Sequence, residues 1–356
     1  MYHLLICIIY DSRYVGVGQY EVFGFIVKLL AMTVWTLTDL DKWCEEVVLP
    51  KTYHKLPKRF FSRRVPLDKD TQKEDRHLKS FAGETISAID YLCMFFQIEL
   101  EPKKQLLEHG ECLLSLKWAL DILMAGDSGL KHADALERLF DSHHRLYLHL
   151  YGIQLAKVKF HLCHHLAGQL RRFGVNLNCF KTERMHHLIH QLAHAKQLSL
   201  YERAILKRVC ADMLENTEDE AFVETYLGKP VQSSPELRPT LLALEPDVGH
   251  SIASSKFIHN SLGQLSHGDL LAFCNCGGVQ LGRLDLCAAA PKLLSPTKVN
   301  FVSYQPYALE NGVFVPELRA PQWCRSDAIL STLVSREGKK GVHILWKWQC
   351  MHAMAD

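Results

Sequence analysis

The residues with the most obvious chemical potential in this chain are histidines gathered in one segment, residues 161–194, HLCHHLAGQLRRFGVNLNCFKTERMHHLIHQLAH. The segment holds seven histidines, two cysteines and a single acid, Glu183, in a pattern otherwise typical of two helices. Imidazole, thiolate and carboxylate groups are the side chains that bind zinc and other transition metals. The composition therefore predicts a metal site, a phosphate-binding face or a polar, histidine-rich helix surface.

Two of these histidines have a spacing suited to a shared metal ion. His161 and His165 are four residues apart, which places both rings on one face of a helix. A structural zinc ion takes four ligands, so two further donors must come from elsewhere. The candidates are a His-x-x-Cys pair and two nearer cysteines: His109, Cys112, Cys163 and Cys179. The spacing alone favours solvated helix histidines over a zinc site.

Glu183 follows the residues CFKT and falls in the first turn of an expected helix over 183–197. A carboxylate in that position is stabilised by the helix dipole, which is reason enough for its presence. Its open helix end could equally present the carboxylate to a divalent cation. The residues alone leave both interpretations open.

A second chemical signal is the segment 51–64, KTYHKLPKRFFSRR, which has basic residues, no acid and interleaved aromatic rings. Such a stretch can contact a phosphate backbone, although a solvated basic loop has the same composition. With the Arg-Arg pair that follows the histidines, it supplies the predicted DNA-binding residues: Lys51, Lys55, Lys58, Arg59, Arg63, Arg64, Arg171 and Arg172.

The overall composition is that of a globular protein with no single dominant charge. The 356 residues are 48% hydrophobic and 22% charged, with a formal net charge of +2, so composition alone indicates no nucleic-acid binding. Twelve cysteines without paired spacing, and no cleavable signal, predict reduced thiols in the nucleus or cytoplasm. The apolar stretch Tyr20–Leu37 is interrupted by Glu21 and Lys28, and we expect a buried helix there and no membrane association.

The elements that must position these residues change character along the chain. Apolar residues recur every three or four positions from 75 to 227, which predicts helices over 75–100, 103–126, 131–151, 157–173, 183–197 and 201–215. Beyond a Pro- and Ser-rich stretch, turn signals at Gly277-Gly278 and Asn311-Gly312 predict two hairpins, and GVHILWKW predicts a last strand. The expected class is α+β, a mainly helical region followed by a small β-rich module. The predicted divisions are a hydrophobic and basic segment, a helical domain, a linker and the β module: 1–74, 75–228, 229–239 and 240–356.

The order of the motifs around the histidine pair resembles the end of the catalytic core of DDE-type DNA transposases, in the CACTA-like branch. The similarity lies in His-x-x-x-His, the Gly-centred turn RRFGVNL and then CFKTERMHH, and it is strongest over 157–187. The resemblance implies an RNase H-like core with a helical insertion. It also implies a zinc site at His161 and His165, completed by His109 and Cys112, and a catalytic acid at Glu183.

One departure from the family pattern decides the expected activity. The family's two aspartates should lie upstream of the insertion, and MYHLLI resembles the residues just after the second of them, so the chain is expected to be N-terminally truncated. Two-metal phosphoryl chemistry needs carboxylates around both cations. We therefore expect a catalytically inactive transposase remnant that keeps zinc and DNA binding, with Mg²⁺ bound only if the missing acids come from elsewhere. The alternative is a helical protein–protein interaction protein, and the partner of the β module is not predicted.

Overall fold

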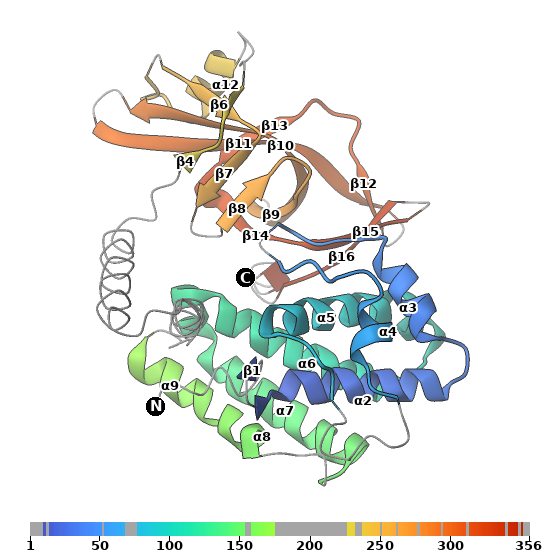
Figure 1. The fold of residues 1–356 in the computed structure, drawn as a ribbon. Coiled ribbons are helices and arrows are strands. Elements are labelled where there is room, and N and C mark those ends of the chain that lie inside the picture. The colour runs from blue at the N-terminus through green and yellow to red at the C-terminus, as the bar shows by residue number, and fades with distance from the viewer. Residues whose placement is uncertain are drawn as a thin grey trace, which may run out of the picture.

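The computed structural model describes most of the chain, with several gaps. The described residues are 10–11, 14–51, 53–67, 77–153, 158–174, 226–231, 237–249, 251–260, 263–275, 278–292, 295–310, 313–338, 341–347 and 350–351. They confirm the α+β class, because helices fill the N-terminal half and an antiparallel sheet fills the C-terminal half (Figure 1). Glu183 and the helices predicted over 183–197 and 201–215 lie outside the described residues.

The N-terminal half contains eight described helices, and those that lie between residues 75 and 173 agree with the four predicted there. The eight helices are α2 (Val17–Ala31), α3 (Leu37–Cys44), α4 (Phe60–Arg64), α5 (Ala82–Phe95), α6 (Leu107–Met124), α7 (Ala133–Tyr151), α8 (Val158–Cys163) and α9 (His165–Phe173). A π-helical turn, Phe96–Leu100, continues α5, and Gly174, with φ of 73°, ends α9. No helix among the described residues is long and apolar enough to cross a membrane, and α2 is the buried helix expected there.

The helical core is built around α5, which is buried on nearly every side. A helix that is apolar all round must lie inside its domain, and both α2 and α6 pack against this one. The close approach of α6 requires a glycine. A Cβ atom at Gly110 would lie 2.1 Å from Cε2 of Phe96, so even a methyl group has no room there.

The C-terminal half is one large antiparallel sheet with a small sheet beside it. Its strands are β4 (Tyr226–Leu227), β5 (Pro230–Val231), β6 (Ala253–Ser255), β7 (Phe257–Asn260), β8 (Gly263–Ser266), β9 (Leu270–Asn275), β10 (Gly278–Lys292), β11 (Ser295–Glu310), β12 (Val313–Pro316), β13 (Gln322–Arg325), β14 (Ile329–Thr332), β15 (Val334–Gly338) and β16 (Gly341–Leu345). The β9–β10 and β11–β12 hairpins confirm both predicted turns, and β16 confirms the predicted last strand.

The predicted linker contains described parts of two elements. In the predicted linker 229–239, Pro230–Val231 forms β5 and pairs with β6, while helix α12 (Leu237–Leu244) begins inside it and packs into the core of the β module. Pro230 therefore lies in a short edge strand, and Pro239 lies in the first turn of α12. Both positions tolerate proline because its missing N–H is not needed there.

The described part of the predicted N-terminal segment 1–74 contacts both halves of the protein. Helix α2 lies in the helical core, and strand β3 (Val47–Val48) pairs with β15 at the end of the large sheet. Beside this pairing, the Arg336 guanidinium lies 4.5 Å from the ring centroid of Trp43 and forms ion pairs with Glu46 and Glu99. The two halves of the chain are thus joined by main-chain and side-chain contacts.

A buried group of charges marks a second junction between the halves. Lys117 of α6 forms ion pairs with Asp121 and, at 3.9 Å, with Asp90 of α5. Tyr53 bonds to Asp90, and Nζ of Lys347, just after β16, lies 5.2 Å from the Tyr53 ring centroid. Burial raises the pKa of Asp90 to about 6 and lowers the pKa of Lys347.

The contact between Gly110 and Phe96 gives a direct test of the helical packing. We expect Gly110→Ala to lower the free energy of unfolding by about 1–3 kcal/mol, because the added methyl group overpacks the core. Gly168→Ala in α9 is the matched control. A Cβ there meets nothing within 4 Å, so this change should be neutral or stabilise by up to about 1 kcal/mol. Urea denaturation of both variants measures the difference, and equal stabilities would contradict the packing.

Candidate metal centre

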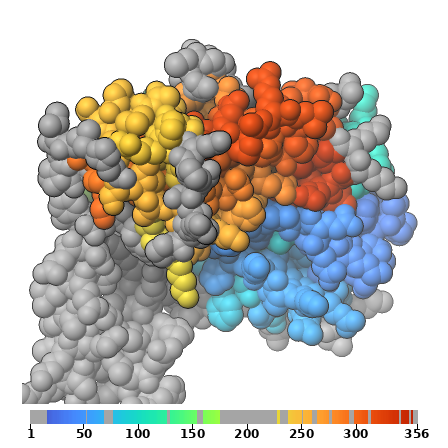
Figure 2. All heavy atoms as spheres, turned by 90° about the horizontal axis from the view of Figure 1, so that it is seen from above, coloured from blue at the N-terminus to red at the C-terminus, as the bar shows by residue number. Residues whose placement is uncertain are grey.

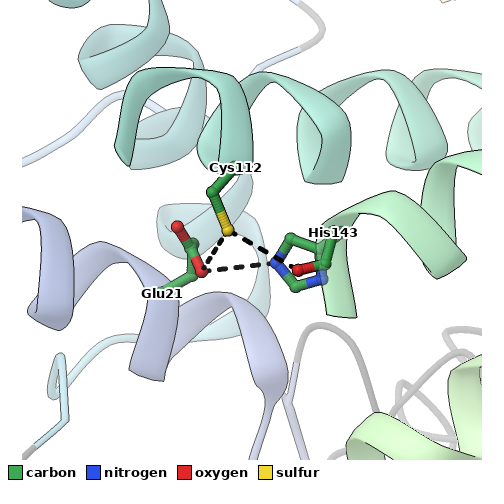
Figure 3. A group of neighbouring side chains, drawn as sticks. All are labelled: Glu21, Cys112 and His143. Carbon is green, nitrogen blue, oxygen red and sulfur yellow. Dashed lines mark hydrogen bonds and ion pairs between the residues drawn. The ribbon is translucent and has the colours of Figure 1, made fainter. Parts of the chain in front are cut away.

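Three helices each contribute one metal-binding side chain to a single point in the helical core (Figure 3). Glu21 comes from α2, Cys112 from α6 and His143 from α7. One donor atom from each side chain lies within 4.8 Å of the other two. Within the part of the chain that the structure describes, this is the one group of three or more such donors.

The donor atoms are in close contact. Nε2 of His143 lies 3.3 Å from Oε2 of Glu21, and Sγ of Cys112 lies 3.6 Å from the same oxygen. The Cys112 thiol also lies 3.7 Å from the main-chain oxygen of His143. The Glu21 oxygen is therefore the common point of contact for the other two side chains.

The group is closed off from water. Glu21 and Cys112 have no exposed surface, and His143 is 2% exposed. Although Oε2 of Glu21 has two neighbours, Oε1 is buried with no hydrogen-bond partner among the described residues. An unpartnered carboxylate oxygen in a dry core is costly, so this position favours a cation.

Aromatic rings surround the histidine side of the group. The Phe160 ring lies nearly parallel to that of His143, with centroids 6.0 Å apart, and Tyr147 lies 5.9 Å away. Burial, followed by the negative charge of Glu21, raises the pKa of both Tyr147 and Tyr151. Neither phenol supplies a charge that could balance the carboxylate.

The spacing of the three donors fits a small divalent cation. Metal–ligand distances of about 2.0–2.3 Å in a tetrahedral zinc site place the donor atoms roughly 3.3–3.6 Å apart. The two separations that involve Glu21, 3.3 and 3.6 Å, match this range. A ligand set of one carboxylate, one thiolate and one imidazole also binds zinc in preference to magnesium or calcium.

The same three residue types occur in cysteine hydrolases, but the geometry here does not suit a nucleophile. Burial, and then the charge of Glu21, raises the pKa of the Cys112 thiol, so without a bound cation to stabilise the thiolate the thiol stays protonated and unreactive. The thiol has no exposed surface through which a substrate could reach it. Metal binding is therefore the chemistry that this arrangement supports.

The structure divides the four residues predicted to bind zinc among three places. Cys112 lies in the buried group, while Nδ1 of His109 contacts the Tyr151 hydroxyl at 3.1 Å. The rings of His161 and His165 meet edge to face with centroids 5.0 Å apart, as the four-residue spacing predicts, but both are exposed on α8 and α9. The described residues thus bring together the two histidines, but not the set of four.

Two donors of the buried group, Glu21 and His143, were absent from the sequence prediction. Glu21 was visible only as a charge within an apolar stretch, and His143 as half of a His-His pair that suited a helix surface. A carboxylate placed inside a buried helix is a signal of a functional partner, but the partners come from helices about 90 and 120 residues further along. No local pattern connects them.

A second histidine contact lies between α7 and the α8–α9 junction. Nδ1 of His144 and Nε2 of His164 are 2.7 Å apart, and Nδ1 of His164 lies 3.1 Å from the Asp141 carboxylate. Burial lowers the pKa of His144, and the neighbouring His164, His143 and His161 lower it further. The neutral form of His144 is therefore favoured, and one imidazole of the pair donates to the other.

The predicted DNA-binding residues have different surroundings. The side chains of Lys51, Lys55, Lys58, Arg59 and Arg63 are exposed, with no ion pair among the described residues. Arg64 is half-buried and lies 3.5 Å from Glu84, while Arg171 bonds to Asp134 and Glu137 of α7 and so joins α9 to α7. Arg172 is exposed over the Phe173 ring.

The chain matches no protein-family model, no curated protein and no solved structure.

The His144–His164 contact predicts a pH-dependent stability. A histidine whose pKa is lower in the folded state binds protons more weakly there, so its contribution is present above an ordinary pKa of about 6.5 and is lost as the pH falls through the lowered value. We expect His144→Gln to reduce the loss of stability between about pH 7 and pH 5. His149→Gln, an exposed histidine on the same helix, is the control. Superimposable pH profiles of wild type and His144→Gln, from thermal denaturation, would contradict this assignment.

Proposed function

We propose that this chain is a zinc-stabilised DNA-binding protein related to the DDE transposases, without their DNA-cutting activity. The observation that carries the proposal is the group of exposed cations on residues 51–63, among which Lys55, Lys58, Arg59 and Arg63 form no ion pair with the described residues. Figure 2 shows this part of the chain, in light blue, on the surface beside the β module. The relationship to transposases rests on the order of the sequence motifs.

A surface of this kind suits a phosphate backbone. Each cation that contacts a phosphate displaces a condensed counterion, which gives affinity without sequence preference and makes binding sensitive to salt. Of the acids near this surface, Asp269 interacts with Lys51, and two others are engaged by groups outside the exposed cations. Asp41 is buried and accepts hydrogen bonds from the main-chain N–H groups of Phe61 and Ser62, and Glu84 is held at the start of α5.

The metal has a structural role in this proposal. Glu21, Cys112 and His143 would hold the ion, which would neutralise the buried carboxylate and tie α2, α6 and α7 together. A structural zinc site contributes directly to folding free energy. Cleavage is not part of the proposal, since Glu183 is the one family acid that the motif supplies and one carboxylate cannot hold two metal ions.

Elemental analysis tests the metal site. We expect protein purified with zinc to retain about one ion per chain, and Cys112→Ala or Glu21→Gln to lose it, because each removes a donor. A chelator should lower the melting temperature of the wild type but not that of Cys112→Ala. Cys93→Ala, an equally buried thiol of α5, is the control.

Two outcomes would contradict the assignment of the ligands. One is retention of zinc by both Cys112→Ala and Glu21→Gln. The other is loss of zinc from Cys163→Ala or His161→Ala, which would place the ion at the exposed histidines.

Salt-dependent binding tests the DNA interface. We expect the quadruple change of Lys55, Lys58, Arg59 and Arg63 to Gln to weaken binding to a nonspecific duplex and to reduce the slope of log K against log salt by about 0.9 for each phosphate that is no longer bound. A control with the same net charge changes four exposed cations elsewhere: Lys104, Lys131, Arg138 and Arg145. Gel shifts at several salt concentrations compare the two, and with magnesium present the duplex should remain uncut.

If both quadruple variants lose the same affinity for the duplex, segment 51–63 is not the DNA interface. Absence of any salt-sensitive shift would instead favour the helical protein–protein interaction protein. Nicking of the duplex that disappears in Glu183→Gln would show that the chain cuts DNA.

A further inference from the structure

An exposed aromatic ring lies against the basic segment. Phe81, the residue before α5, is 62% exposed, and the guanidinium carbon of Arg64 lies 5.9 Å from its ring centroid. A large apolar side chain with this exposure stabilises its own protein little, since burial is the source of hydrophobic free energy. Its position beside cations suggests a role in binding.

The ring is held on a rigid support. The main-chain N–H of Phe81 donates to the Glu84 carboxylate at 3.0 Å, which closes the first turn of α5. Glu84 also pairs with Arg64, and the N–H of Lys79 donates to the main-chain oxygen of Arg64 at 3.0 Å. These contacts fasten the segment 77–81 to α4 and add an exposed lysine, Lys79, to the basic surface.

A second exposed ring lies on the same helix turn. The His54 imidazole covers Gly83, where a Cβ atom would lie 2.1 Å from its Cδ2 atom. The Ser87 hydroxyl donates to the main-chain oxygen of His54 at 2.7 Å and fixes the loop that carries it. Two rings, His54 and Phe81, therefore stand at the start of α5 beside the cations of α4.

We propose that Phe81, with His54 beside it, stacks against unpaired nucleobases, so that the DNA-binding surface prefers single-stranded over double-stranded DNA. This inference rests on the proposed DNA binding and names the form of DNA that the surface takes. A nucleobase offers a flat π-face to an exposed ring, and a guanidinium next to that ring adds to the attraction. The cations of segment 51–63 would hold the phosphates on either side.

Single-stranded DNA fits this surface better than a duplex does. In a duplex each base is covered by its neighbours above and below, so an exposed ring can reach only sugars and phosphates without unstacking a step. In a single strand the faces of the bases are free, and stacking on aromatic side chains tolerates any sequence. The ring therefore adds affinity only for the unpaired form, whereas the cations add affinity for both.

Fluorescence anisotropy with a labelled oligothymidylate and a nonspecific duplex, using the full chain, tests the inference. We expect Phe81→Ala to weaken oligothymidylate binding by about five- to a hundredfold and to change duplex binding by less than about twofold. Phe81→Tyr should retain binding, since it keeps the ring, and His54→Ala should show a smaller effect than Phe81→Ala. Leu318→Ala, another exposed apolar residue, is the control, and thermal denaturation confirms that each variant is folded.

The outcomes separate this inference from the proposed function. If the wild type binds both DNAs in a salt-sensitive way but Phe81→Ala binds oligothymidylate normally, the stacking role is wrong and the basic surface stands. Equal weakening on both DNAs would also overturn it, because stacking cannot act on a paired base. If the wild type binds neither DNA, the proposed function fails, and an exposed Phe81 beside Arg64 would then point to a protein partner.

Discussion

The need to compensate buried charge constrains the whole helical half of this protein. Glu21, Asp90 and Lys117 are all at most 4% exposed, in a core where an uncompensated charge costs several kcal/mol. Lys117 pairs with Asp90 and Asp121, and Lys347 supplies a second cation, so that group is close to neutral. Glu21 differs, because one of its oxygens has no partner among the described residues and its two neighbours are a thiol and an imidazole. The arrangement of α2, α6 and α7 therefore depends on what neutralises Glu21.

The second buried charge group explains why the β module is attached as it is. Lys347 follows the last strand of the sheet, and its position against Tyr53 brings a second cation to the group formed by Asp90, Asp121 and Lys117. The contact of Arg336 with Trp43 and the pairing of β3 with β15 also join the helical half to the sheet. Both use polar groups that would otherwise bond to water. Buried polar contacts of this kind specify one arrangement more than they stabilise it. The two halves behave as one structural unit for that reason.

The parts of the fold that the sequence predicts are those with a local cause. Apolar periodicity identified the helices between residues 75 and 173 but not α3 and α4, and turn residues located the β9–β10 and β11–β12 hairpins. The two-residue strand β3 and the edge strand β5 have too little periodicity to be seen, and their pairing partners lie far away in the chain. The candidate site follows the same rule. Cys112 was selected from a local His-x-x-Cys spacing, whereas Glu21, His143 and the contact of Phe81 with Arg64 exist only once the helices have packed.

Helix α5 connects the two proposed binding properties while keeping them physically independent. Its sides pack against α2 and α6, which carry Glu21 and Cys112, whereas its first turn supports Phe81 and contacts α4. Phe81 contacts Glu84, Thr85 and Arg64, which lie in the first turn of α5 and on α4, away from the three metal donors. Removal of a metal ion would therefore loosen α2 against α6 and α7 before it disturbed the basic surface. A structural metal that supports a binding surface without touching it is the arrangement these contacts favour, and it requires no cleavage chemistry from the centre itself.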